Sequence, residues 1–387
     1  MVILLNVTAR TPLYQKIQQY IRELIESEGL KSGDRIPTEK ELMERFDVSK
    51  ITVVKALTGL ANENVISRVP GKGSFVSEPA AAEEAEVPRP VFGRAPEEVK
   101  PKTGLIGLVM PSIYDYFAVR LIDGVRRGLS SKGYRTMILL SEGDLEHEKE
   151  AIKTLKQIGA EGILVFPVDE EHYNDEILNL KFSGFPFVLI DRFLPGVETN
   201  YIAADGRLGT RLAVEHLWEL GHREIAICSD SPLQTVTVQE RIEGYMDALK
   251  DKGALINPAH IITGFRIHAS DEPEKHPLYR YIRSGLATAY ITLNGKLGVQ
   301  IQQMAKRNGL SIPDDLSIVS FDDPTSVVEE LSVFTHIKQF EYEMGLRAAE
   351  TLVDIIGEGT DRSGGYTKTL LVPELVVGQT TGPVKPR

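Results

Sequence analysis

The spacing of apolar residues in the first part of the chain predicts two amphipathic helices. Apolar residues recur at steps of three and four between Leu13 and Ile25, and Gly29 ends the pattern. Thr38 stands three residues before Glu41, which is the spacing of a capping box, so a second helix is expected to begin at Thr38. The core face of this second helix would carry Leu42, Met43 and Phe46.

A third helix and a hairpin follow. Ser49 is expected to cap the third helix, whose core face carries Val53, Ala56, Leu57 and Leu60. The opposite face carries Lys50, Thr52 and Lys55. Two β-prone runs, 65–69 and 74–76, are joined by the turn residues 70–73 and predict a β-hairpin. Two helices joined by a tight turn and followed by a hairpin predict a winged helix-turn-helix, an α+β fold.

From residue 105 onward, apolar strands alternate with amphipathic helices. The predicted strands are 105–110, 136–140, 163–166 and 187–190, with helices near 118–132, from 144 and from 174. The pattern then restarts with a helix at 207–220, a strand at 224–228, a helix at 241–252, a strand at 289–292, a helix ending at 307 and a strand at 317–321. This alternation predicts an α/β domain with parallel sheets in two lobes, and ligands of such sheets bind beyond the carboxyl ends of the strands.

Residues 79–102 separate the two patterns. They contain five prolines, a run of alanines and several glutamates. Proline favours extended geometry and clustered acidic residues repel one another, so this composition predicts a linker. We therefore expect a winged helix-turn-helix domain over residues 1–78, a linker over 79–102 and a two-lobed domain over 103–387.

Charge is distributed unevenly over the 387 residues, whose net charge is −11. Residues 1–80 carry 11 Lys and Arg against 10 Asp and Glu, whereas the remainder carries 33 against 45. The acidity therefore belongs to the larger domain, and the near-neutral first domain can bind DNA if its basic groups share one face. The first apolar run, Val2 to Leu5, is too short for a signal peptide or a membrane span, so we expect a cytoplasmic protein with no membrane partner.

The familiar signatures of enzymes and metal sites are missing. The first strand of the larger domain leads into Met110-Pro111-Ser112, without the glycines that a pyrophosphate needs. The sequence has no G-x-S-x-G or H-E-x-x-H motif, and its single cysteine, Cys228, lies in an apolar run typical of a buried strand. We expect no catalysis, no cofactor and no metal. Trp218 and His222 are expected to serve packing and the end of a helix.

Residues 10–78 resemble the DNA-binding domain of the GntR family of bacterial regulators. The resemblance rests on Tyr14 and Ile17, on the stretch RIPTEKELMERFDVSKITVVKAL, and on the wing GKGSFV. It implies that Ser49, Lys50 and Thr52 contact bases or phosphates, that Arg35 contacts phosphate, and that Lys72 enters the minor groove. Family members carry arginine at the positions of Lys50 and Val54, and lysine lacks the planar fork with which arginine reads guanine.

Residues 104–380 resemble the sensor domain of LacI/GalR regulators, itself similar to periplasmic sugar-binding proteins. The matching phrases are GLVMP, FVLIDR, EHLWELGHREIAIC, RIEGYMDALKDKG, GLSIPDDLSIVSFDDP and THIKQF. The resemblance implies ligand contacts from Arg241, Asn294, Asp322 and Gln339, then from Asp191 with Arg192, and an aromatic wall from Phe117. Arg241 is expected to begin a helix, and Asp323 to cap a loop. Asn294 is followed by glycine where these sensors have aspartate.

A GntR-type head on a LacI/GalR-type sensor resembles the arabinose repressors of Gram-positive bacteria. This resemblance implies a repressor of carbohydrate-utilisation genes that binds double-stranded operator DNA as a homodimer and is released by a sugar such as L-arabinose. Three alternatives stay open: a different polar ligand acting as corepressor, an enzyme-linked GntR-type regulator, and a transport binding protein.

Overall fold

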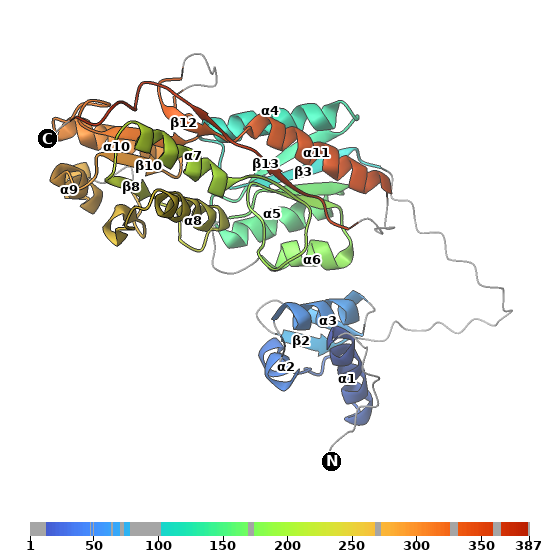
Figure 1. Ribbon diagram of the computed structural model, residues 1–387. Coiled ribbons are helices and arrows are strands. Elements are labelled where there is room, and N and C mark those ends of the chain that lie inside the picture. The colour runs from blue at the N-terminus through green and yellow to red at the C-terminus, as the bar shows by residue number, and fades with distance from the viewer. Residues whose placement is uncertain are drawn as a thin grey trace. The chain divides into compact units, whose positions relative to one another are not determined.

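The computed structural model describes residues 13–46, 48, 50–62, 65–69, 73–77, 102–168, 174–267, 272–325, 332–358 and 365–385 (Figure 1). Contacts within the chain divide it into two units, residues 1–100 and residues 101–387. Only Lys102 of the predicted linker belongs to the described residues.

The described part of the first unit contains three helices and a hairpin, as the sequence predicts. In chain order they are α1 (Leu13–Ser27), α2 (Glu39–Phe46), α3 (Lys50–Asn62), β1 (Ile66–Val69) and β2 (Gly73–Val76). Their apolar faces meet in one core that includes Ile17, Ile21, Leu42, Val53, Ala56, Leu57 and Leu60. The periodicity of the sequence therefore identified the correct buried face of each helix.

The predicted capping box forms at the start of α2. The backbone N–H of Glu41 donates to Thr38 Oγ1 at 3.3 Å, and the backbone N–H of Thr38 donates to Glu41 Oε2 at 2.8 Å. Because these bonds favour the ionised carboxylate, they lower the pKa of Glu41. Two backbone donors that the helix leaves free are thus satisfied by side chains.

The segment before α2 is tied to the hairpin. Strands β1 and β2 pair antiparallel, and Arg35 forms an isolated antiparallel bridge with Phe75. Ile36 N–H donates to Ser74 O at 3.0 Å. The hairpin is therefore held against the start of the helix-turn-helix by backbone hydrogen bonds.

The second unit contains two lobes, each built on a six-stranded sheet of described residues. The N-lobe has strands β3 (Leu105–Met110), β4 (Arg135–Leu140), β5 (Gly162–Val165), β6 (Phe187–Ile190), β7 (Tyr201–Ala204) and β13 (Lys368–Leu371), and helices α4 (Tyr116–Ser130), α5 (Leu145–Gln157), α6 (Asp175–Ser183) and α11 (Glu341–Glu358). Its strands are ordered β13-β7-β6-β5-β3-β4, and all neighbouring strands are parallel.

The C-lobe repeats this order. Its strands are β8 (Ile225–Cys228), β9 (Ile261–Ile262), β10 (Ala289–Thr292), β11 (Ser317–Phe321), β12 (Thr335–Lys338) and β14 (Glu374–Val376), and its helices are α7 (Gly206–Glu219), α8 (Val236–Asp251), α9 (Pro277–Ser284) and α10 (Gly295–Arg307), with short 3-10 helices η1 (Pro258–His260) and η2 (Pro273–Lys275). The order is β14-β12-β11-β10-β8-β9, parallel except that β14 runs antiparallel to β12. The predicted α/β class is confirmed.

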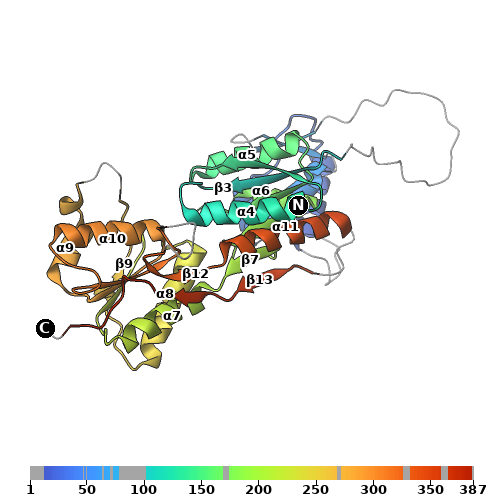
Figure 2. The same cartoon turned by 90° about the horizontal axis from the view of Figure 1, so that it is seen from above.

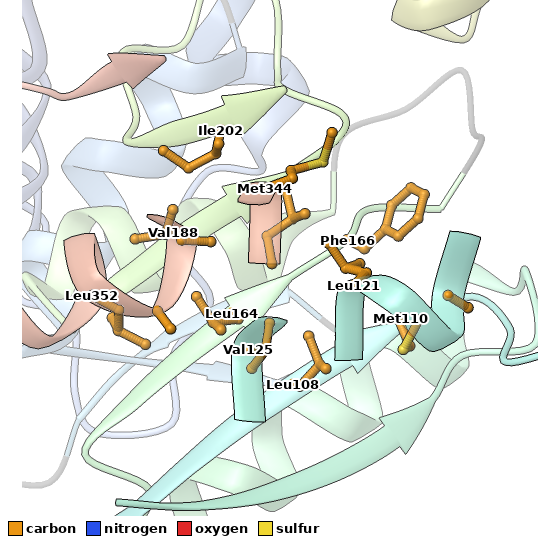
Figure 3. Close-up of a cluster of buried hydrophobic side chains, with 14 of the residues drawn as sticks. Leu108, Met110, Leu121, Val125, Leu164, Phe166, Val188, Ile202, Met344 and Leu352 are labelled. Carbon is orange, nitrogen blue, oxygen red and sulfur yellow. The ribbon is translucent and has the colours of Figure 1, made fainter. Parts of the chain in front are cut away.

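Helices cover both faces of each sheet (Figure 2). In the N-lobe, α4 and α11 lie side by side on one face and α5 and α6 on the other. Figure 3 shows the core under the first pair, in which fully buried side chains of the two helices meet fully buried strand residues: Leu121, Val125, Met344 and Leu352 against Leu108, Leu164 and Val188. Burial of such surfaces from water is the main stabilising contribution to each lobe.

Within the described residues the chain passes three times between the lobes, from β7 to α7, from β12 to α11 and from β13 to β14. The first two passages exchange helices, because each lobe is completed by the helix that follows the other lobe's strand. The lobes therefore share covalent connections as well as a cleft.

Within the N-lobe, helices α4 and α11 approach so closely at Gly124 and Gly345 that neither position has room for a Cβ.

Two expectations are corrected. Helix α8 begins at Val236, so Arg241 lies in its second turn instead of beginning it. Strands β7, β9, β12, β13 and β14 extend the two sheets beyond the predicted strands. In the described part of the chain, no helix is both long and apolar enough to cross a bilayer.

Candidate functional site

The residues expected to contact DNA are only partly described. Ser49 and Lys72 lie outside the described residues, as does the side chain of Lys50. Thr52 is half-buried in the first turn of α3. The guanidinium of Arg35 lies at the start of β2, where a Cβ added to Gly73 would stand 3.2 Å from Arg35 Nε.

Two other positions of α3 have structural roles. Val54, where relatives of the GntR family carry arginine, is 1% exposed and belongs to the interior. The ammonium of Lys55 lies 3.9 Å from the ring centroid of Tyr14, a cation–π contact that joins α3 to α1. Tyr14, one of the residues that carry the resemblance, thus fixes the position of the helix expected to enter the major groove.

All seven residues predicted to bind ligand line one cavity between the lobes. It encloses about 700 Å³, including space open to solvent. The seven are Phe117, Asp191, Arg192, Arg241, Asn294, Asp322 and Gln339. They come from both lobes because the carboxyl ends of the strands of the two sheets meet at the cleft.

The C-lobe wall is a chain of hydrogen bonds. Arg241 Nη1 donates to Leu293 O at 2.7 Å and Nη2 to Gln339 Oε1 at 2.8 Å. Gln339 Nε2 in turn donates to Asp322 Oδ1 at 2.6 Å, and the guanidinium of Arg241 lies 4.0 Å from the ring centroid of Phe321. Each side chain is thereby held in one orientation before a ligand arrives.

Asp322 is held in an unusual electrostatic and backbone setting. Burial raises the pKa of its carboxyl well above the ordinary value, and repulsion from the buried Glu341 adds to the effect, opposed by Gln339 and Arg241. Its φ is 64°, in the left-handed region, and its N–H donates to Ile337 O at 3.1 Å. The carboxyl is fixed where the chain leaves β11.

Asn294 caps the helix that follows it. Its Oδ1 accepts from Leu297 N–H at 2.8 Å, and its Nδ2 donates to Asp230 Oδ1 at 2.6 Å. The next position, Gly295, departs from the family pattern, and a Cβ there would stand 3.0 Å from Cβ of Pro324. A carboxylate does lie beside Asn294, but it comes from Asp230, in the loop after β8.

The N-lobe wall combines the carboxylates of Asp115 and Asp191 and one arginine with two aromatic rings. Arg192 Nη1 donates to Pro167 O at 2.7 Å, and its guanidinium lies 4.8 Å from the ring centroid of Phe166. Phe166 and Phe117 are 5.8 Å apart between centroids. Asp191 Oδ2 lies 3.9 Å from Arg192 Nε. Phe117 is 9% exposed, so it belongs both to the core and to the cavity wall.

The sequence missed several polar residues of the cavity. Ser231, Thr235 and Thr237 come from the loop after β8 and the start of α8. Thr235 could have been recognised as the N-cap of a helix beginning at Val236, because threonine is a favoured N-cap residue. Placing the helix start at Arg241 concealed this signal.

Glu240, also unassigned by the sequence, stands next to Arg241 on α8. Burial raises its pKa to about 7, with smaller contributions from the carboxylates of Asp205 and Asp191, while Arg241 opposes the shift. Asp205 caps α7, accepting from Leu208 N–H at 2.8 Å. Acidic groups from both lobes thus act on one carboxyl at the edge of the cleft.

The residues assigned to packing behave accordingly. His222 is 2% exposed, and its ring contacts Thr288, Ser317 and the carbonyl of Gly382. Cys228 is buried in β8, and burial raises the pKa of its thiol. Trp218 packs against the core between α7, α8 and the sheet. Asp323 caps a turn, accepting from Thr325 N–H at 2.9 Å.

Two family models match the chain. The model for bacterial regulatory proteins of the gntR family matches residues 13–76, and the model for a periplasmic binding protein-like domain matches residues 214–381. These matches fall in the first and second units respectively.

Relatives among curated proteins match nearly the whole chain. The arabinose metabolism transcriptional repressor of Geobacillus stearothermophilus is 29% identical over 381 residues, which cover 96% of this chain and 98% of that protein. The repressor of the same name from Halalkalibacterium halodurans is 29% identical over 382 residues, with coverage of 96% and 97%. The likeness therefore extends through both units.

Solved structures of LacI-family regulators share the fold of the second unit. The regulator from Mycobacterium smegmatis has a TM-score of 0.59 and 26% identity, covering 72% of this chain and 100% of that one. The regulator from Enterococcus faecium with bound ribose has a TM-score of 0.59 and 24% identity, covering 73% and 100%. The chain thus joins a domain that matches the model of the bacterial gntR family to a periplasmic-binding-protein-like domain with the fold of LacI-family regulators.

Proposed function

We propose that this protein is a transcriptional repressor of carbohydrate-utilisation genes, released from operator DNA by a small neutral sugar such as L-arabinose. The observation that carries the proposal is the cavity between the lobes, lined by all seven predicted ligand residues in a chain with a GntR-family head. The names of the relatives, arabinose metabolism transcriptional repressors, support the same function. These relatives are regulators, so we infer that the chain acts by binding and not by catalysis.

The charges of the cavity favour a neutral ligand over a phosphorylated one. The lining includes the carboxylates of Asp115, Asp191 and Asp322. Both lining arginines are already engaged by protein acceptors, Arg241 by Leu293 O and Gln339, and Arg192 by Pro167 O. A phosphate would therefore meet three carboxyl groups beside two arginines that already donate to protein acceptors, whereas the hydroxyl groups of a neutral sugar can pair with both carboxyl groups and amides.

For the DNA-binding half of the proposal, we assign base or phosphate contacts to Ser49, Lys50 and Thr52, a phosphate contact to Arg35 and a minor-groove contact to Lys72. One small DNA-binding domain covers only a short stretch of DNA, so we propose a homodimer that binds a twofold-symmetric operator. We also propose that the protein is cytoplasmic. Replacing Lys72 by alanine should then weaken operator binding and reduce its salt dependence, whereas the exposed Lys132→Ala in the second unit should change neither.

The proposal is tested by binding of the full chain to DNA duplexes selected from a random pool. Fluorescence anisotropy is measured with and without L-arabinose, D-ribose, D-xylose, D-glucose and the phosphates of these sugars. A sugar present at 100 times its dissociation constant should also raise the free energy of unfolding by about 2.7 kcal/mol. Release by a neutral sugar supports the proposal. Tightened binding would identify a corepressor, and a response to phosphates alone would contradict the neutral ligand.

A further inference from the structure

The cleft contains a second cavity beside the first. It encloses about 490 Å³, including open solvent, and shares Arg192 and Thr235 with the cavity described above. We call the first cavity, lined by Asp191, Arg241 and Asp322, the polar compartment. The second, lined by Leu145 and Val236 among others, is called the apolar compartment. Its walls come from both lobes.

The two compartments differ in chemistry. Eight of the thirteen side chains that line the apolar compartment are aliphatic, aromatic or proline, including Leu145, Ile177, Leu194 and Val236. Among the described residues, one carboxylate lines the compartment and is fully buried, and one surface-exposed amide, Gln234, completes the C-lobe side. An apolar concave surface of this kind binds rings and other apolar groups and disfavours strongly hydrated ones.

The buried carboxylate, Glu148, is already satisfied by the protein. Its Oε2 accepts from Val168 N–H at 2.7 Å and its Oε1 from Asn174 Nδ2 at 2.7 Å. It shapes the compartment by joining α5 to the two ends of the segment between β5 and α6.

Thr235, at the junction of the compartments, has a hydroxyl that the protein leaves unused. It occupies the N-cap position of α8 yet makes no side-chain capping bond, and its buried Oγ1 has no hydrogen-bond partner within the described part of the chain. The residue is 5% exposed. Asp115, the N-cap of α4 in the N-lobe, does accept from Ala118 N–H at 2.8 Å. Buried hydroxyls nearly always have a partner, so the free hydroxyl points to a ligand atom at this junction.

We propose that the cleft binds a neutral glycoside in two parts, with the sugar ring in the polar compartment and its aglycone or second ring in the apolar compartment. The Thr235 hydroxyl bonds an oxygen of the ligand where the two parts join. The inference rests on the proposed function, since it places a sugar in the polar compartment, and it adds the class of ligand that fills the whole cleft.

The test is calorimetric titration of the full chain with free L-arabinose, D-xylose and D-glucose and with their 4-nitrophenyl glycosides. For the sugar that binds, the glycoside should bind at least about tenfold more tightly, because the nitrophenyl ring leaves water. Leu145→Trp, which fills the apolar compartment from the half-buried start of α5, should abolish this gain while changing the affinity for the free sugar less than about twofold. Ile158→Trp, exposed at the other end of α5, is the matched control.

Thr235→Val keeps the shape of the side chain and removes the hydroxyl. It should weaken glycoside binding about fivefold or more, whereas Thr154→Val on the exposed face of α5 should not. If a free sugar binds and its glycoside binds no more tightly, the proposed role of the apolar compartment is wrong and the proposed function is unaffected. The same conclusion would follow if Leu145→Trp lowered the affinities for the free sugar and for the glycoside equally. If none of the six compounds binds, both the inference and the proposed sugar effector are wrong.

Discussion

The two lobes repeat one strand order but build different walls of the cleft. In each sheet the first strand lies between the second and third, and the fourth and fifth follow in turn. The C-lobe presents a hydrogen-bonded chain through Arg241, Gln339 and Asp322, whereas the N-lobe presents Phe117, Phe166 and the Asp191–Arg192 pair. The topology therefore fixes where the site lies, and the side chains at the strand ends decide which lobe supplies polarity.

Two aspartates show this most directly. Asp191 follows β6 and Asp322 follows β11, which are equivalent strands, and their φ angles are 63° and 64°. Each backbone N–H donates to the next strand, to Ile202 O at 2.8 Å and to Ile337 O at 3.1 Å. Aspartate tolerates this left-handed conformation better than larger residues do. The backbone position is the same, and only Asp322 is hydrogen-bonded to Gln339.

The largest effect should come from removing these carboxyls one at a time. Asp322→Ala deprives the ligand of a carboxyl and leaves Gln339 Nε2 without its acceptor, so the affinity for the sugar should fall at least about tenfold and the operator should stay bound when sugar is added. Asp191→Ala should weaken binding less, because this mutation leaves in place the bonds from Arg241 to Gln339 and from Gln339 to Asp322. Both alanines meet the same backbone strain, so the comparison isolates the carboxyls.

Titration calorimetry and operator binding give the readouts, with the exposed Asp251→Ala as control. Equal losses for Asp191→Ala and Asp322→Ala would show that the lobes contribute alike.

A smaller effect is expected for the two arginines. Arg241→Lys loses the fork that bonds Leu293 O and Gln339 together, and sugar affinity should fall about five- to tenfold. Arg192→Lys can keep a single bond to Pro167 O, so a decrease of about twofold is expected. The single tryptophan, Trp218 on α7, provides a fluorescence signal for the titrations. If Arg192→Lys lowers the affinity more than Arg241→Lys does, the N-lobe supplies the stronger polar contacts.

The pH dependence of stability should sharpen the comparison, because Glu240 of the C-lobe is partly buried and the carboxylates of Asp205 and Asp191 also raise its pKa. Its folded pKa of about 7 exceeds the ordinary value of 4.5, so the native state holds the proton more tightly. Stability from this group is therefore fully present below pH 4.5 and is lost as the pH rises to about 7. Because solvent screens this partly exposed carboxyl, we expect the free energy of unfolding to fall by about 1 kcal/mol over this range.

Urea unfolding at pH 5 and pH 7.5 checks this, with Glu240→Gln expected to reduce the pH dependence and the exposed Glu243→Gln expected to preserve it. An unchanged pH dependence in Glu240→Gln would show that Glu240 is not its source.

The smallest difference concerns the helix caps. Asp115→Ala removes the capping bond of α4 and should lower the free energy of unfolding of the second unit by about 1 kcal/mol. Thr235→Val, at the equivalent position of α8, should change it by no more than about 0.5 kcal/mol, because Thr235 makes no capping bond. Denaturation followed by circular dichroism measures both. A large loss in Thr235→Val would give its hydroxyl a structural role.

Local patterns were sufficient to predict much of the fold. Helices α1 to α3 followed from apolar spacing, and the Thr38–Glu41 capping box depends on residues three apart. The seven cavity residues were grouped in advance by the resemblance to LacI/GalR sensors. For Asp191, Asn294 and Asp322 the grouping also agrees with the rule that parallel strands bring their carboxyl ends to one edge. Short-range periodicity and this rule predict the cleft, and the resemblance selects its side chains.

The remaining features depend on contacts between distant segments. The run Val236-Thr237-Val238 has β propensity, and α8 nevertheless includes it because its packing against α7 overrides local preference. Strands β13 and β14 have three or four residues each and become recognisable only beside β7 and β12. Likewise, the pairing of Asn294 with Asp230 joins residues 64 positions apart.

The exchange of helices between the lobes sets an order for folding during synthesis. Gly124 on α4 packs against the backbone of Tyr342 on α11, 218 positions later, so the N-lobe begins first on the ribosome but cannot bury the face under α4 until α11 has emerged. Contacts of such long separation close slowly. The C-lobe, whose helices α7 to α10 are consecutive, can assemble most of its core earlier. A nascent chain that stops before α11 therefore exposes the apolar surface shown in Figure 3 and becomes a substrate for chaperones and proteases.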